Sequence, residues 1–197
     1  MQETSWYAMN LLMKIFFTLF VLFFSSLAFA EDITDFQIEG ISIGDSLLDY
    51  LSEEKILKQI NNPEVSYEDR DPPGKYSEIY KFDGLKTYSV LSVFVEGGDK
   101  KYLIHGMFGE VKNSSIEKCL EEKSKVIKEF DILFKEEAEV SNLEFSISAG
   151  FIYESRYFLK TLDRVNIQCI KAPNYQQHNS LIISLTNHTL SEWLIFE

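Results

Sequence analysis

The sequence contains few of the residues from which metal sites and nucleophilic sites are built. Histidine occurs three times in 197 residues, at His105, His178 and His188, and cysteine occurs twice. No His-x-x-x-His pair and no mixed Cys/His spacing of the zinc-binding kind is present. The phosphate-binding Gly-x-x-x-x-Gly-Lys and dinucleotide-binding Gly-x-Gly-x-x-Gly patterns are missing too. We therefore expect no metal site and no bound cofactor.

Positive charge is also scarce. The chain has 19 Lys and Arg against 31 Asp and Glu, which gives a formal net charge of −12. Such a surface repels nucleic-acid phosphates and anionic lipids, so we expect no nucleic-acid partner. The 16 Phe and 10 Tyr residues argue against a disordered acidic chain and favour a packed core.

The most apolar segment of the chain is too short to cross a membrane. Ile15–Phe24 is a ten-residue run broken only by Thr18, whereas a membrane-spanning helix needs about 20 apolar residues. Lys14 precedes the run, and the small-residue pattern Ala28-x-Ala30 ends it. A basic residue, a short apolar stretch and a small-x-small end are typical of a secretory signal.

We predict that residues 1–30 are a signal peptide, cleaved between Ala30 and Glu31. Translation starts at Met1 or at Met13, because the sequence from Met13 onward already forms a complete short signal. Residues 31–197 are then expected to form a single domain that is periplasmic or secreted, with no stable membrane span after processing.

Cys119 and Cys169 both lie in the predicted mature chain. A pair of cysteines in an exported protein favours a disulfide bond, because the compartment is oxidising. Two buried thiols are the alternative. The disulfide would close a loop of about 50 residues and stabilise the fold by roughly 3–4 kcal/mol in the chain-entropy model.

The first part of the mature chain predicts a short helical segment followed by strands. Apolar residues recur at three- and four-residue spacing from Leu47 to Ile60, and Asp45 or Ser46 is a candidate N-cap for this segment. Residues rich in Tyr, Val, Ile and Phe follow, with glycine-containing turn signals between them. They predict an antiparallel meander, with strands at 75–82, 86–96 and 100–111.

The second part predicts one long helix and more strands. Ser114 begins a capping box that ends at Glu117, and an amphipathic helix is expected over 114–137. Four strand-like segments follow, at 143–149, 151–160, 164–171 and 180–187. The chain ends in a predicted helical turn with Trp193 packed inward. Because helices and strands do not alternate singly, we predict an α+β fold with a mainly antiparallel sheet packed against the long helix.

The motif Gly44-Asp45-Ser46-Leu47 resembles the one that marks a family of secreted serine esterases. In that family the serine follows a strand, and a histidine from an Asp-x-x-His motif takes its proton. None of the three histidines here has Asp three residues before it, and no Asn-Asp pair is present for an oxyanion site. We therefore predict that Ser46 is a helix N-cap. The enzymatic alternative is a small esterase with Ser46 as its nucleophile.

The segment Asp69–Gly74 resembles the start of a calcium-binding loop. Asp occupies positions 1 and 3 and Gly occupies position 6. Position 5 is Pro73, which offers no ligand, and position 12 is Tyr80 where a bidentate glutamate is needed. We interpret the segment as a polar turn.

Four segments carry a wider resemblance: "DFQIEGISIGDSLLDYLSEEKI", "IHGMFGEVKNSSIEKCLEEKSKVIKEF", "DRVNIQCI" and "LIISLTNHTLSEWL". Together they resemble small exported proteins of marine alphaproteobacteria, a family with no assigned activity. The resemblance spans most of residues 35–194 and includes both cysteines, so it implies export, one domain and the disulfide.

The opening "GISIG" followed by a helix also resembles small two-layer α+β envelope domains, such as outer-membrane assembly lipoproteins and β-lactamase-inhibitor-like modules. The residue directly after the predicted cleavage site is Glu31 and not the cysteine that a lipid anchor requires.

These observations favour a non-catalytic binding or interaction module of the cell envelope. Its partner is expected to be an envelope protein or a small ligand, met through exposed aromatic and acidic surface. The alternatives are the Ser46 esterase and a protein inhibitor. An esterase requires a base beside Ser46, whereas an interaction module requires a contiguous apolar or aromatic patch.

Overall fold

The fold is described by a computed structural model of the chain. It describes residues 33–61, 67, 70–80, 82–134, 137–147, 150–171 and 179–194. The predicted signal peptide 1–30, its cleavage site at Ala30 and Glu31, and His178 lie outside these residues. None of the described helices is both long enough and apolar enough to cross a membrane.

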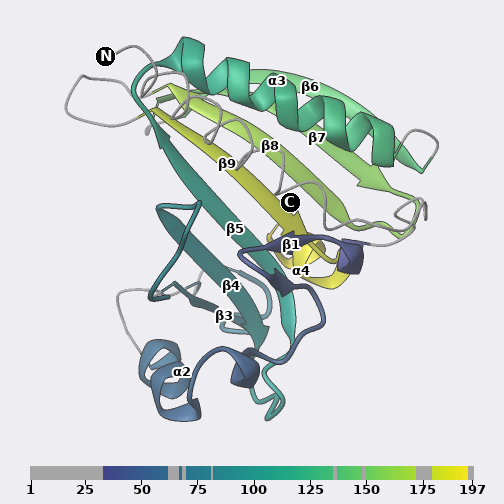
Figure 1. Cartoon of the computed structure of the whole chain (residues 1–197). Helices are drawn as coiled ribbons and strands as arrows, with labels where there is room; N and C mark the ends of the chain where they lie inside the picture. The colour runs from purple at the N-terminus through teal and green to yellow at the C-terminus, as the bar shows by residue number, and fades with distance from the viewer. Residues whose placement is uncertain are drawn as a thin grey trace, which may run out of the picture.

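A single seven-stranded antiparallel sheet dominates the structure (Figure 1). Its strand order is β3-β4-β5-β9-β8-β7-β6. The strands are β3 (Tyr76–Ile79), β4 (Val90–Glu96), β5 (Ile104–Asn113), β6 (Ala138–Ile147), β7 (Gly150–Leu159), β8 (Arg164–Lys171) and β9 (Asn179–Thr186). Two meanders, β3–β5 and β6–β9, meet where β5 pairs with β9. The predicted α+β class with a mainly antiparallel sheet is confirmed.

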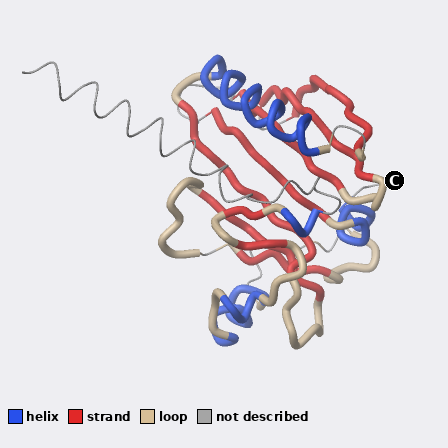
Figure 2. The backbone as a smooth tube through the Cα atoms, turned by 45° about the vertical axis from the view of Figure 1, so that its right-hand side comes forward, coloured by secondary structure: helices blue, strands red, loops and turns tan. Residues whose placement is uncertain are grey.

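One long helix, α3 (Ile116–Leu133), connects the two meanders and packs on one face of the sheet. It lies along β8 and β9 and also contacts β5 (Figure 1). We call this side the front face and the opposite side the back face. The tube view shows α3 at one end of the molecule and α2 at the other (Figure 2).

The predicted start and end of this helix were wrong. Its N-cap is Ser115 and not Ser114, because Ser115 has an extended backbone and its hydroxyl accepts a hydrogen bond from the Lys118 N–H. The helix ends at Leu133 and not at 137, because the chain turns there to begin β6, where Ala138 pairs with Leu159.

The N-terminal segment completes the front-face core. It comprises the 3-10 helix η1 (Ile33–Asp35), the strands β1 (Gln37–Ile38) and β2 (Ile41–Ser42), the 3-10 helix η2 (Leu47–Asp49) and the helix α2 (Glu53–Ile60). Phe36 packs between Phe130 and Phe134 of the long-helix end, with ring centroids 5.2 and 4.9 Å apart. One continuous apolar cluster therefore joins this segment, α3 and the sheet.

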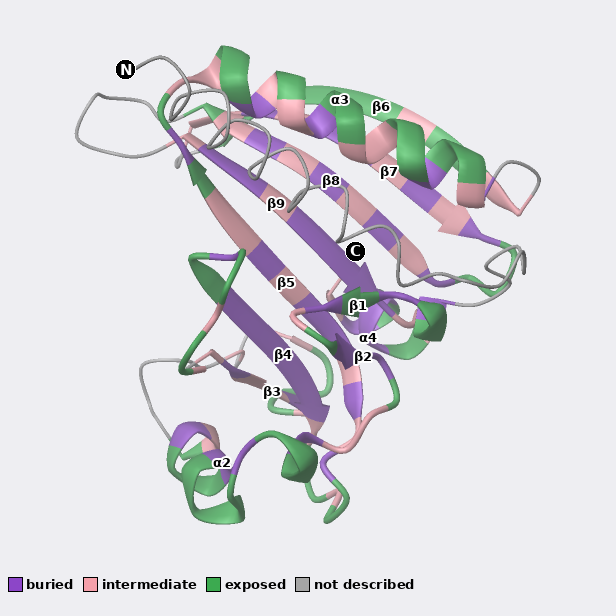
Figure 3. Ribbon diagram, viewed as in Figure 1, coloured by how far each residue is buried: buried purple, intermediate pink, exposed green. Residues whose placement is uncertain are grey.

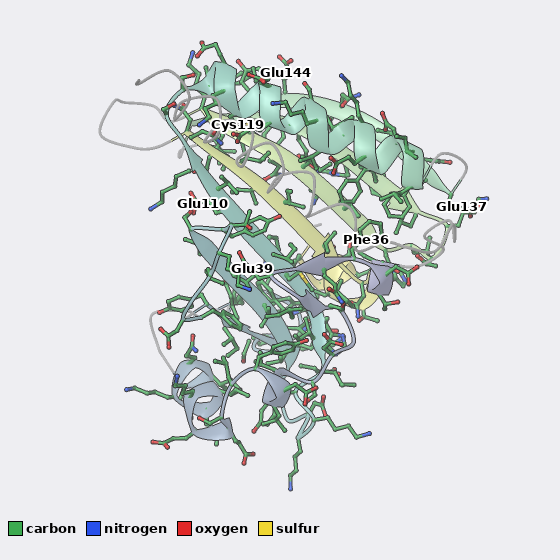
Figure 4. The ribbon with its side chains drawn as sticks, in the orientation of Figure 1. Phe36, Glu39, Glu110, Cys119, Glu137 and Glu144 are labelled. Atoms are coloured by element: carbon green, nitrogen blue, oxygen red, sulfur yellow. A yellow bond between two sulfur atoms is a disulfide. The ribbon has the colours of Figure 1, made fainter. Side chains whose placement is uncertain are left out.

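The disulfide between Cys119 and Cys169 is present, which confirms the prediction. It joins α3 to β8, and both cysteines are fully buried. Figure 4 labels Cys119 beneath the helix and Phe36 near β1, two points of the same front-face core.

A short helix, α4 (His188–Leu194), covers one end of the back face. Leu190 and Trp193 are buried there against Tyr76 and Phe94, so Trp193 does pack inward. A Cβ atom at Gly106 would lie 2.3 Å from a methyl group of Leu190. Glycine at 106 is therefore what lets α4 approach β5 so closely.

Candidate functional site

Ser46 lies at the start of η2 and acts as its N-cap. Its hydroxyl donates to the Lys101 carbonyl at 2.7 Å and accepts from the Leu48 N–H at 3.3 Å. Asp45 is not the cap, which corrects that alternative. Its carboxylate accepts from the Ser42 N–H at 2.9 Å and from the Tyr50 hydroxyl at 2.6 Å. The pKa of Tyr50 is raised to about 12, mainly by burial and secondly by the hydrogen bond to Asp45.

The two described histidines contact residues other than Ser46. The Nδ1 atom of His105 lies 2.9 Å from the Asn187 amide nitrogen, and its ring packs against Tyr76. Burial lowers the pKa of His105. His188 Nε2 lies 3.5 Å from a Glu192 oxygen. Among the described residues, Ser46 thus has a capping environment without a base to take its proton.

A lysine–serine pair that sequence reasoning missed lies under α3. Lys123 Nζ donates to the Ser155 hydroxyl at 2.9 Å, and Ser155 donates to the Asn142 side chain at 2.5 Å. Burial lowers the pKa of Lys123, although Glu154 and Glu144 oppose the change. Only 1% of Ser155 is exposed, so a substrate has no access to it, and we interpret the pair as a structural polar network. Its sequence signal is that Lys123 lies one turn after Cys119 on the buried side of the helix.

The described residues contain no group of three His, Cys, Asp or Glu side chains that could hold a metal ion. The calcium-like segment is described only from Arg70 onward. There the Asp71–Pro72 peptide bond is cis, and the Pro72 carbonyl accepts a hydrogen bond from the Trp193 indole at 2.9 Å.

A pocket of about 270 Å³ opens on the back face beside α4. Its lining comes from β3, β4, β5 and β9, together with Tyr67 and Leu194. We call it the back-face pocket, and its lining residues are Tyr67, Glu78, Val90, Ser92, Phe94, Phe108, Gly109, Glu110, Ile182 and Leu194.

Aromatic rings form the apolar part of this pocket. The ring centroids of Phe94 and Phe108 lie 5.3 Å apart in an edge-to-face arrangement, and those of Tyr67 and Phe94 lie 5.7 Å apart. Tyr67 also contacts Trp193 of α4 at 5.4 Å. These contacts fix the rings. Phe94 is only 2% exposed, so the exposed ring surface at the pocket comes from the half-buried Tyr67 and Phe108.

Two carboxylates, Glu78 and Glu110, lie among these rings. The Tyr67 hydroxyl donates to Glu78 at 2.7 Å, and the Ser180 hydroxyl donates to Glu110. Glu110 of β5 is labelled in Figure 4, and its strand partner on β4 is Val90, which also lines the pocket. Within the described part of the chain, neither carboxylate makes an ion pair.

The sheet brings these residues together in a way that the sequence could not show. Glu78 pairs with Phe94 across β3 and β4, and β5 places Phe108 and Glu110 on the same face as Phe94. The only sequence signal is a glutamate inside each of two apolar strand segments, which alternation assigns to the same face as an aromatic neighbour.

The far edge of the back face is apolar. Leu143, Phe145 and Ile147 alternate along the edge strand β6 and remain 36–43% exposed. In Figure 3, β6 is mainly exposed, whereas β4 and β9 are mainly buried. Phe145 pairs with Ile152, which pairs with Ile170, so an apolar row runs inward from this edge.

Comparison of the chain with protein-family models, with curated proteins and with solved structures found no match.

Proposed function

We propose that the protein is a non-catalytic binding module of the cell envelope, and that its back-face pocket binds a cationic group of a partner. The observation that carries this proposal is the presence, among the aromatic rings of one pocket, of two carboxylates that make no ion pair with any described residue. The capped state of Ser46 supports the non-catalytic reading.

The chemistry of the pocket favours an ammonium or guanidinium group. A cation held against an aromatic face gains about 0.5–2 kcal/mol, and more when water is excluded. Glu78 and Glu110 add a charge-assisted hydrogen bond each. The net charge of −12 extends this preference over the whole surface, because it raises the local concentration of basic partners.

We favour a basic segment of another envelope protein as the partner, with a small cationic ligand as the second candidate. The exposed Leu143, Phe145 and Ile147 of β6 offer such a segment further apolar contact area on the same face. Export is part of the proposal. It is supported by the predicted signal sequence, and a buried disulfide is consistent with an oxidising compartment.

The test is in-cell crosslinking of a tagged chain that carries a photoreactive residue at Val90, which is 38% exposed on the pocket rim. The pocket variant is Glu78→Gln/Glu110→Gln. The control variant, Glu54→Gln/Glu122→Gln, removes the same charge from α2 and α3. We expect a specific partner with the unmodified chain and the control, and its loss with the pocket variant.

Equal recovery with all three chains would contradict the pocket assignment. Recovery of the monomer alone would turn attention to small cationic ligands. These would be tested by calorimetry on the same two variants, and failure there as well would overturn the proposal.

A further inference from the structure

Two arginines converge on one aromatic ring at the β7–β8 end of the back face. Arg156 lies on β7 and Arg164 on β8, and Phe158 is the strand partner of Arg164. Their guanidinium carbons lie 5.8 and 5.0 Å from the Phe158 ring centroid. The ring holds both planar groups by stacking.

Arg164 has no partner for its charge within the described residues. It makes no ion pair there, and its buried Nε–H has no hydrogen-bond acceptor. Burial lowers the pKa of Arg164, and the charge of Arg156 lowers it further. The nearby carboxylate of Glu192 opposes the change, but an oxygen of it lies 3.5 Å from His188.

Arg156 is only partly satisfied. Its Nε–H donates to one oxygen of Glu154 at 2.8 Å, and the other Glu154 oxygen is buried without a partner. Asn166, the strand partner of Arg156, also has a buried side-chain oxygen without a hydrogen bond. Unpaired buried polar atoms thus gather on one stretch of the back face, where each costs free energy until a ligand or water satisfies it.

We propose that Arg164, together with Arg156, forms a binding site for an anionic group, either a phosphate or a carboxylate. Guanidinium groups present a fork of N–H donors that matches the oxygens of both anions. A negative charge beside the two arginines would relieve their mutual repulsion, and the guanidinium groups of these partly exposed side chains would donate hydrogen bonds to it.

This site lies beyond the proposed function and does not depend on it. It sits on β7 and β8, whereas the back-face pocket lies over β3, β4, β5 and β9. A partner that carried both a basic and an acidic group could use both sites at once.

The experiment is titration of the purified exported chain with inorganic phosphate, and separately with acetate, at constant ionic strength. Thermal stability and calorimetry are the readouts. The test variant is Arg164→Gln. The matched control is Lys160→Gln, which removes one exposed positive charge nearby that pairs with Glu137. Arg164→Lys keeps the charge without the fork.

We expect saturable phosphate binding by the unmodified chain and by Lys160→Gln. Affinity should fall about tenfold or more in Arg164→Gln and by a smaller factor in Arg164→Lys. Binding of phosphate without acetate would favour a phosphorylated ligand, and binding of acetate without phosphate would favour a carboxylate. Binding of both would support the anion site for either group.

An unchanged affinity in Arg164→Gln, or the absence of saturable binding of either anion, would overturn the proposal. Within the described residues, Arg164 has no ion-pair partner that its removal would leave unpaired, so Arg164→Gln is expected to fold. The Glu78→Gln/Glu110→Gln variant should keep its phosphate response. The two proposals can therefore fail separately.

Discussion

In the described chain, the front face of the sheet is covered by other elements along most of its length, whereas much of the back face is not. The front face is covered by α3 and the N-terminal segment, and the disulfide joins α3 to β8. Among the described residues, α4 and Tyr67 cover one end of the back face. This face carries Glu78, Glu110 and Arg164, none of which makes an ion pair in the described chain.

This difference separates stability from recognition. Burial of apolar side chains on the front face supplies most of the favourable free energy of folding. Charged groups without partners on the back face add little to that free energy, yet they remain available to a ligand. Substitutions on the front face should therefore change stability and leave binding intact, and the reverse should hold for the back face.

The largest expected effect is removal of the front-face disulfide. The Cys119→Ala/Cys169→Ala variant should lose about 4 kcal/mol of unfolding free energy, because its loop of 50 residues gains freedom in the unfolded chain. Urea denaturation of the variant measures the loss, and reduction of the unmodified chain should reproduce it. A loss below about 1 kcal/mol would show that the bond does not hold α3 to the sheet.

Two adjacent residues of β5 allow the stability effects of substitutions on the two faces to be compared directly. Met107 is fully buried on the front face, and Phe108 is half-buried in the back-face pocket. Met107→Ala should cost about 3 kcal/mol through the cavity it leaves, and Phe108→Ala about 1 kcal/mol because its ring is already partly in water.

The expected effects on partner crosslinking are opposite. Phe108→Ala should weaken crosslinking, because it removes a ring from the pocket, whereas Met107→Ala should leave it unchanged under conditions where the variant is folded. Denaturant midpoints at constant m-value give the stability comparison. If both variants lost stability equally and neither lost the partner, the division between the faces would be wrong.

Local patterns predicted most strands of the sheet but not all of their first residues. The strand at 164–171 was predicted with its observed bounds, because alternation of apolar residues is strong there. The residues before β4 were assigned to a strand beginning at 86, yet β4 begins at Val90. The reason is distant in sequence: the Glu39 carboxylate accepts hydrogen bonds from the backbone N–H groups of Lys86, Thr87 and Tyr88.

The start of β6 was missed for a similar reason. Residues 138–142, "AEVSN", are mostly polar and follow a strong helical pattern. They form a strand because pairing with β7 supplies their backbone hydrogen bonds, and tertiary pairing then overrides local propensity. The pocket and the arginine site depend on strand register in the same way. Glu78, Glu110 and Arg164 each look like ordinary strand charges until the sheet sets their neighbours.

The smallest expected effect concerns Ser46, which belongs to the front-face segment. Ser46→Ala should lower the unfolding free energy by about 1 kcal/mol, the usual contribution of an N-cap hydroxyl. Its two hydrogen bonds, to the Lys101 carbonyl and from the Leu48 N–H, are what the substitution removes. Thermal denaturation measures the loss, and partner crosslinking should be unchanged because the back face is untouched. The opposite result would be an ester-hydrolysing activity that the purified chain has and Ser46→Ala lacks. It would identify Ser46 as a nucleophile and would place a substrate site in the front-face segment.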